Sequence, residues 1–353
     1  MREKEVKLAD SLEKLSNACG VTGREEEVSV MLKAMLKPYV DEVKIDRLGN
    51  VIGVKKGAKK DAPKVMLAAH MDEVGLMVKS INKDGFLQFS KLGGIDDRIL
   101  IAQRVIVHTE KGKKPGIIGS RPPHIMKDEE RKKVVEVDSL FIDIGAGNKE
   151  EAQKMGVRVG DIVSFDTQFA RVTEDLVVGK AFDDRVGCIM LVEVMRQLEK
   201  ADCTVYAVGT VQEEVGLRGA QVSAFHIIPD VALAFDVTVA GDVPGVQEVE
   251  APAKMKKGPV IGVMDSGLIT HPKVLKMLMN AAKKAKVEYQ LETGLAGSTD
   301  AARIAISREG VPCGVLSIAT RYIHSPSSML SLGDVQKAAK LAVAAIGEAV
   351  RVF

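Results

Sequence analysis

Four short apolar runs most strongly constrain how this chain can fold. They cover residues 65–69, 204–211, 231–235 and 314–318, and polar residues follow each of them within a few positions. Runs of this length fit buried strands, and segments with helical spacing lie between several of them. Because helices that alternate with buried strands are the pattern of a sheet covered by helices, we expect an α/β fold.

The expected helices are marked by apolar residues at helical spacing. The first carries this spacing from Leu8 to Ala18, and Gly20 and Gly23 follow as helix breakers. Further helices are expected over residues 25–36, 185–198, 272–285 and 334–350. A pair of strands is expected next, the first over residues 41–57, with Gly49 and Asn50 near the turn, and the second over residues 64–78. In the last helix the apolar residues form one stripe, which predicts a face packed on the core.

Between residues 73 and 166 the pattern changes to short alternating segments with frequent glycine and proline. This pattern is typical of a small all-β module. A chain of 353 residues also exceeds the usual size of one hydrophobic core. The simplest architecture is therefore an α/β domain made of residues 1–72 and 167–353, interrupted by a β-rich insertion of residues 73–166.

Charge and composition exclude several classes of function. The 50 Lys and Arg nearly balance the 48 Asp and Glu, which leaves a net charge of +2 and no overall field to attract nucleic acid. The basic runs at 111–114 and 130–133 are short and read as solvated surface. No segment approaches the about 18 apolar residues of a membrane span, and the N-terminal segment lacks an apolar signal core. We expect neither a nucleic-acid nor a membrane partner.

The four cysteines are Cys19, Cys188, Cys203 and Cys313, and no two of them form a C-x-x-C pair. They lie in largely apolar segments, so they predict buried free thiols in a reducing compartment. Together with the absence of a signal core, this predicts a cytoplasmic protein.

Acidic and imidazole side chains gather after the apolar runs. In chain order they are His70 and Asp72, Asp183 and Asp184 before a helix, Glu213 and Glu214, Asp236, and His324. Taken singly, each has an ordinary explanation, because a histidine can pack at a strand end, an aspartate can cap a helix and a glutamate pair can mark where a strand reaches solvent. Ligands of open α/β sheets bind at the carboxyl ends of the strands, so we expect these residues to lie together. Such a cluster of carboxylates repels itself unless cations neutralise it.

Mixed imidazole and carboxylate ligands suit zinc, cobalt or manganese, and the cluster holds more ligands than one ion needs. Two ions bridged by a carboxylate produce a nucleophilic water near neutral pH and polarise a carbonyl, which is chemistry that hydrolyses amides or esters. One residue of the Glu213–Glu214 pair would then bind metal while the other moves the proton. Asp72 is placed to fix the tautomer of His70.

Six motifs carry a resemblance to a known family. They are AAHMDEVG, GKAFDDRVG, TVQEEVGLRGA, LAFDVT, GSTDAA and RYIHSP, and they span essentially the whole chain. In this order and spacing they resemble the TET-type (tetrahedral) aminopeptidases, dinuclear metallopeptidases that include FrvX-like and deblocking aminopeptidases and are sometimes labelled endoglucanases. The resemblance implies a zinc-peptidase-like mixed sheet covered by helices, with an inserted small β-barrel or PDZ-like dimerisation domain. It also implies dimers assembled into a tetrahedral dodecamer and oligopeptide substrates.

The resemblance implies a role for each residue at the strand ends. Asp183 would bridge two ions of Zn²⁺ or Co²⁺. His70 and Asp236 would complete one metal site, and Glu214 and His324 would complete the other. Glu213 would act as general base, Asp72 would orient His70, and Asp184 is left as a supporting residue. Two parts of the substrate pocket are expected, residues 292–302 and the region around Arg321, without a defined side-chain preference. The loop at residues 120–133 is expected on the surface, or projecting toward a chamber or a neighbouring site, and His124 is not expected to be a ligand.

Two alternative functions stay open at this point. An endoglucanase would also use paired carboxylates, but the chain has no tryptophan and only 4% aromatic residues, so platforms for sugar stacking are scarce. Glycoside hydrolysis also gives no reason for His70 and His324. A non-enzymatic scaffold of the same fold would lack a ligand or the base, whereas all of them are present.

Overall fold

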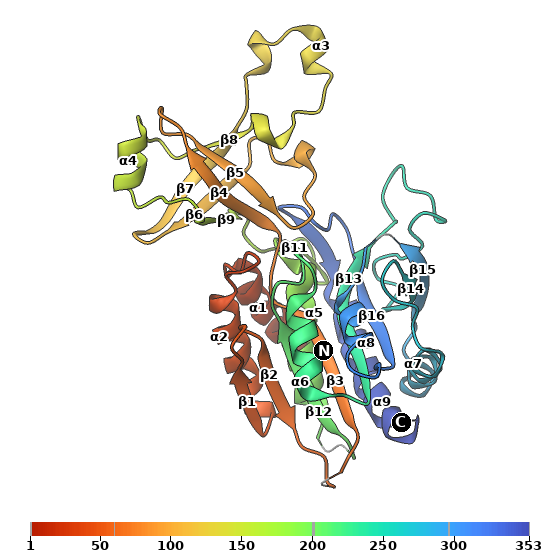
Figure 1. Ribbon diagram of the computed structural model, residues 1–353. Coiled ribbons are helices and arrows are strands. Elements are labelled where there is room, and N and C mark those ends of the chain that lie inside the picture. Colours follow the sequence, from red (N-terminus) through yellow and green to blue (C-terminus); the bar gives the residue numbers. More distant parts are fainter. Residues whose placement is uncertain (1, 60, 200–201, 296, 353) are drawn as a thin grey trace.

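The computed structural model describes residues 2–59, 61–199, 202–295 and 297–352 (Figure 1). Its body is an eight-stranded sheet with the order β1-β2-β12-β3-β13-β16-β14-β15. The strands are β1 (Glu42–Ile45), β2 (Val51–Lys55), β3 (Lys64–His70), β12 (Thr204–Thr210), β13 (Val231–Val239), β14 (Val260–Asp265), β15 (Gln290–Leu295) and β16 (Cys313–Thr320). The central strands β12, β3, β13 and β16 run parallel, so their carboxyl ends lie at one edge.

Helices cover both faces of this sheet (Figure 1). One face carries α1 (Arg2–Asn17), α2 (Glu26–Leu36), α5 (Phe182–Gln197), α7 (Pro272–Ala285) and α9 (Leu332–Val352). The other carries α6 (Arg218–Ile227) and α8 (Asp300–Ala305). The predicted stripe of α9 is buried against the first face, which confirms its assignment to the core.

The β-rich segment folds into a closed barrel with the strand order β4-β5-β8-β7-β6-β9. Its strands are β4 (Gly75–Ile81), β5 (Leu87–Leu92), β6 (Arg104–Thr109), β7 (Gly112–Gly119), β8 (Phe141–Asp143) and β9 (Ile162–Phe165). The barrel has its own core of buried side chains, among them Leu76, Val107 and Ile142. Figure 1 shows it beyond the edge where β3 ends. The fold class is thus confirmed, while the domain boundaries at 72 and 166 stay a prediction.

Smaller elements complete the described part of the chain. They are the helices α3 (Asp128–Arg131) and α4 (Lys149–Lys154), the 3₁₀ turns η1 (Lys37–Tyr39), η2 (Asp97–Ile99), η3 (Pro123–Ile125) and η4 (Val137–Ser139), and a three-stranded sheet of β10 (Ala170–Arg171), β11 (Leu176–Gly179) and β17 (Ser328–Ser331). The loop at residues 120–133 includes η3 and α3 and projects from the barrel (Figure 1).

Two elements differ from the expectation in a way that affects the site. The strand expected at residues 231–235 continues to Val239, because its pairing with β16 extends to the partners Val239 and Thr320. Asp236 therefore lies within β13 and not after it. The helix expected from residue 185 begins at Phe182, although Asp183 and Asp184 depart from helical backbone angles.

All four cysteines are buried and free, as predicted. None of the helices in the described residues is both long and apolar enough to span a bilayer.

A buried ion network ties α1, the start of α5 and the chain after β3 together. Glu73 accepts hydrogen bonds from Lys180 Nζ at 2.8 Å to both oxygens and from Arg185 Nη2 at 3.1 Å. Arg185, whose side chain is fully buried, also donates through Nε to the carbonyl of Met71 at 2.8 Å and through Nη1 to that of Leu15. Burial alone would raise the pKa of Glu73, but the charges of Lys180 and Arg185 outweigh it and lower that pKa.

Arg185→Met should lower the free energy of unfolding by about 3–5 kcal/mol, because removing one member of a buried, fully bonded ion network leaves its partners unsatisfied. The measurement is guanidinium unfolding at fixed protein concentration. Arg104→Met is the matched control, since Arg104 pairs with Asp166 at 2.7 Å with a side chain that is 75% exposed. An equally small decrease in the free energy of unfolding in both variants would contradict the predicted contribution of Arg185 to stability.

Candidate metal centre and active site

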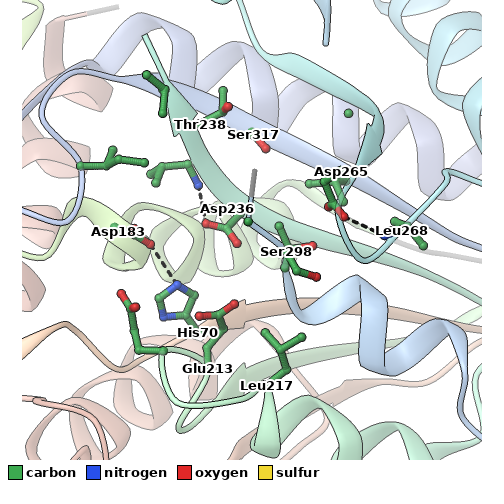
Figure 2. Close-up of a pocket in the computed structure, with 18 of the residues that line it drawn as sticks. His70, Asp183, Glu213, Leu217, Asp236, Thr238, Asp265, Leu268, Ser298 and Ser317 are labelled. Carbon is green, nitrogen blue, oxygen red and sulfur yellow. Dashed lines mark hydrogen bonds and ion pairs between the residues drawn. The ribbon is translucent and has the colours of Figure 1, made fainter. Parts of the chain in front are cut away.

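Asp183 lies between two histidines that come from distant parts of the chain. Its Oδ1 is 3.0 Å from Nε2 of His70, the last residue of β3, and its Oδ2 is 3.2 Å from Nε2 of His324, in the loop after β16. Figure 2 shows the contact between Asp183 and His70. Each oxygen of one carboxylate therefore faces a different imidazole, as a bridging ligand requires.

Two groups of side chains could each hold a metal ion. One consists of His70, Asp183 and Asp236, and the other of Asp183, Glu214 and His324, with the ligand atoms of each group within 4.8 Å of one another. The two groups share Asp183. These donors are imidazole nitrogens and carboxylate oxygens, which fit zinc, cobalt or manganese. Glu213 belongs to neither group, although Figure 2 shows it beside His70.

Asp72 contacts the backbone of the glutamate pair as well as the imidazole of His70. Nδ1 of His70 lies 3.2 Å from the carbonyl oxygen of Asp72 and 3.5 Å from its Oδ1. The two carboxylate oxygens of Asp72 also accept hydrogen bonds from the backbone N–H of Glu213 at 2.9 Å and of Glu214 at 3.1 Å. One buried carboxylate thus positions the turn that carries both glutamates. Sequence reasoning missed this second contact, because its partners lie about 140 positions away.

Asp184 bonds backbone groups beside the site and belongs to neither ligand group. Its Oδ2 accepts from the backbone N–H of His70 at 3.1 Å, and its Oδ1 accepts from that of Gly187 at 2.9 Å. The second bond caps the regular part of α5. The first holds the end of β3 against α5, and the supporting role expected of this residue stays a prediction.

The clustered acids change one another's proton affinity. Burial, followed by the charge of nearby carboxylates, raises the pKa of Asp236 and of Glu213 well above the usual range. Burial and Asp183 raise the pKa of Glu214 to about 7. For Asp183 burial acts in the same direction, but hydrogen bonds from His324 and His70 outweigh it and lower the pKa. The hydrogen bond to Asp183 raises the pKa of His324 to about 9.

Asp300 is a further buried acid beside this cluster. Thr210 Oγ1 donates to its Oδ2, whereas its Oδ1 has no hydrogen-bond partner among the described residues. Burial is the main cause that raises its pKa to about 6. The GSTDAA motif contained this residue, but its spacing gave no signal of a role.

A cavity of about 390 Å³ opens beside the candidate ligands. The predicted pocket segment at residues 292–302 contributes Glu292, Gly297, Ser298 and Thr299 to its lining, while residue 296 lies outside the described residues. Of the second predicted region, Ile323 and His324 line the cavity. Arg321 itself is held elsewhere, since its guanidinium bonds the carboxylate of Asp242 at 3.1 and 2.6 Å.

Residues 49–341 match the M42 glutamyl aminopeptidase family. The chain belongs to the M42 peptidase family. Over 326 residues it is 41% identical to the FrvX protein of Escherichia coli (strain K12), covering 92% of this chain and 91% of the relative. It is also 41% identical to a lysyl aminopeptidase of Pyrococcus furiosus over 340 residues, which are 96% of both chains. The resemblance to TET-type and FrvX-like aminopeptidases is thus confirmed, and this M42 protein is a peptide hydrolase.

Solved structures agree with this membership. A TET aminopeptidase from the archaeon Thaumarchaeota archaeon SCGC AB-539-E09 superposes with a TM-score of 0.94 at 43% identity, covering 99% of this chain and 98% of that one. The TET1 peptidase of Pyrococcus horikoshii, which can assemble into a tetrahedron or an octahedral shell, has a TM-score of 0.86 at 34% identity over 96% and 98%. A Thermotoga maritima structure named endoglucanase superposes with a TM-score of 0.79 at 33% identity, covering 97% of this chain and 98% of that one.

Zn²⁺ binding to the M42 protein should release protons, and more of them at about pH 6 than at about pH 8. At the lower pH Glu214, whose pKa is about 7, is mostly protonated, while His324, whose pKa is about 9, carries its proton at both. Calorimetry in buffers with different ionisation enthalpies counts the protons. Equal release at the two pH values would contradict these pKa shifts.

Proposed function

We propose that this M42 peptidase is a dinuclear metal-dependent aminopeptidase that removes residues from the free N-terminus of oligopeptides. The observation that carries the proposal is the position of Asp183, which offers one oxygen to each of two ligand groups. We assign His70 and Asp236 to one ion and Glu214 and His324 to the other, with Zn²⁺ or Co²⁺ as the ions that suit such ligands.

The bound ions would supply a water nucleophile near neutral pH and polarise the scissile carbonyl. Glu213 is assigned as the general base that takes the proton from that water and returns it to the leaving amine. Its absence from both ligand groups supports this role, and so does a pKa raised by burial and by neighbouring acids. Asp72 would act by positioning, since it holds the backbone N–H groups of Glu213 and Glu214 and faces Nδ1 of His70.

The endoglucanase alternative is favoured by the names of two solved structures, the Thermotoga maritima endoglucanase and a second structure named peptidase/endoglucanase. Against it, the aromatic platforms that bind sugars are missing from the described residues that line the cavity, which include no Trp, Tyr or Phe. Two imidazoles also share the site with the acids. A scaffold without catalysis gives no reason for a complete ligand set. We therefore assign peptide hydrolysis.

For the assembly we propose dimers that associate through the barrel and build a tetrahedral dodecamer. Support comes from the match in fold to a TET1 peptidase that can assemble into a tetrahedron. The loop at residues 120–133, which projects from the barrel, would then lie toward a chamber or a neighbouring subunit (Figure 1). Within it, His124 is exposed and belongs to neither ligand group. Four free, buried thiols support a location in the cytoplasm.

The proposed function is tested by stripping the protein of metal with a chelator and adding back Zn²⁺ or Co²⁺. The reloaded protein should hydrolyse aminoacyl reporter amides and leave carboxymethylcellulose intact, while the stripped protein should hydrolyse neither substrate. Release of reducing sugar without hydrolysis of any aminoacyl amide would refute the peptidase assignment.

Glu213→Gln should retain both ions and lose about 10²–10⁴-fold in kcat, because the amide cannot accept the proton. Asp183→Ala should lose metal, because both ligand groups depend on this carboxylate. Elemental analysis of the purified variants and rates on one aminoacyl amide separate the two effects. Glu150→Gln, on the exposed face of α4, is the matched control. A Glu213→Gln protein with an empty site would reverse the roles assigned to the two glutamates.

A further inference from the structure

A second buried carboxylate lines the cavity and has no role in the metal groups. Glu292, on β15, is 7% exposed, and its Oε2 accepts a hydrogen bond from Thr238 Oγ1 at 2.6 Å. Its Oε1 has no hydrogen-bond partner among the described residues. The hydroxyl of Ser298, in the same lining, is also unpartnered there. Because an unpaired buried carboxylate oxygen is costly, these atoms indicate a place for a ligand.

The position of Glu292 relative to the candidate ligands is fixed by β13. Asp236 and Thr238 are two residues apart on this strand, so their side chains project from the same face about 6.6 Å apart. Figure 2 shows Thr238, with Ser317, on the far side of Asp236 from His70. The carboxylate that Thr238 holds is therefore about one strand repeat beyond the metal ligands. The four-carbon stem of a lysine side chain bridges a gap of this size.

The rest of the cavity favours a side chain with an apolar stem and a positive end. Val315, Met264 and Leu268 contribute apolar side chains to its lining. Asp265 adds a second acid, whose Oδ1 accepts from the backbone N–H of Gly267 and Leu268 at 2.7 Å each. Among the described residues that line the cavity there is no lysine or arginine. An acidic substrate side chain would thus find no partner for its charge.

We infer that this cavity binds the side chain of a cationic N-terminal residue, lysine or arginine, and that Glu292 determines this preference by pairing with its charge. The inference rests on the proposed aminopeptidase function. A neutral side chain of the same length would leave the Glu292 oxygen unpaired, and sites built around a buried polar group discriminate strongly against ligands that cannot pair with it. Burial raises the pKa of Glu292, and a bound cation favours its charged form.

Lysine amide and norleucine amide test this inference, because they share the linear stem and differ in the terminal ammonium. The reloaded wild-type enzyme should show a kcat/KM about 10- to 100-fold higher for lysine amide. In Glu292→Gln most of this preference for lysine amide should be lost, while kcat/KM for norleucine amide stays within a few-fold of the wild-type value. Metal content and melting temperature of the variant show whether it has kept its fold.

Two further variants locate the effect. Glu288→Gln, an exposed glutamate four positions before Glu292, is the matched control and should keep the wild-type ratio. Asp265→Asn should lose less of the lysine-to-norleucine ratio of kcat/KM than Glu292→Gln, because the carboxylate of Asp265 is already bonded to backbone N–H groups. A loss in Asp265→Asn as large as that in Glu292→Gln would overturn the assignment to Glu292.

The failure of this inference differs from the failure of the proposed function. If the kcat/KM of the wild-type enzyme for norleucine amide or glutamate amide equals that for lysine amide, the inference is overturned and the aminopeptidase function still stands. A Glu292→Gln protein that slows on both amides equally would also overturn it, because the residue would then be structural. No hydrolysis of any aminoacyl amide by reloaded enzyme would refute both.

Discussion

The parallel pairing of β12, β3, β13 and β16 is the constraint on which the site depends. In this pairing His70 lies opposite Thr210, and Asp236 lies opposite Ser317. Because side chains alternate between faces, a slip of one residue in either pair would turn a ligand away from the other ligands. The residues of the metal groups are up to 254 positions apart, from His70 to His324, and the backbone hydrogen bonds of the sheet bring them together.

Buried charged groups occur in two arrangements in this protein. One is a fully paired network that supports the fold, and the other is the set of incompletely paired acids at the candidate site. In the first, Glu73 is matched by Lys180 and Arg185, and their remaining donors reach backbone carbonyls. In the second, the acids outnumber the imidazoles, and oxygens of Asp300 and Glu292 have no partner in the described residues. The two arrangements adjoin along the chain, since Glu73 lies three positions after His70 and Arg185 lies two positions after Asp183. The paired network thus anchors the backbone next to two of the candidate metal ligands.

Apolar runs made the central sheet and most of the site predictable. The runs ending before His70 and Glu213 are buried strands, and their strand-end acids and imidazoles do converge. The end of β13 was not predictable, because its continuation depends on pairing with β16 and not on apolar residues. The helices α6 and α8 are short, and β15 has no alternation of apolar and polar residues. Neither helical spacing nor strand alternation therefore predicted these elements. The bonds from Asp72 to the turn at Glu213 join distant positions, which no local spacing reveals.

The arrangement of the sheet separates the chemistry from the choice of side chain. The metal groups come from the parallel centre and the segments that follow it, whereas Glu292 belongs to β15, the edge strand beyond β14. Thr238 joins the two parts, because it lies on β13 with Asp236 and bonds Glu292. The backbone of β13 therefore sets the distance between the candidate ligands and the far end of the cavity. A substitution on β15 can change the charge at that end without moving a ligand, so one metal centre is compatible with different side-chain preferences.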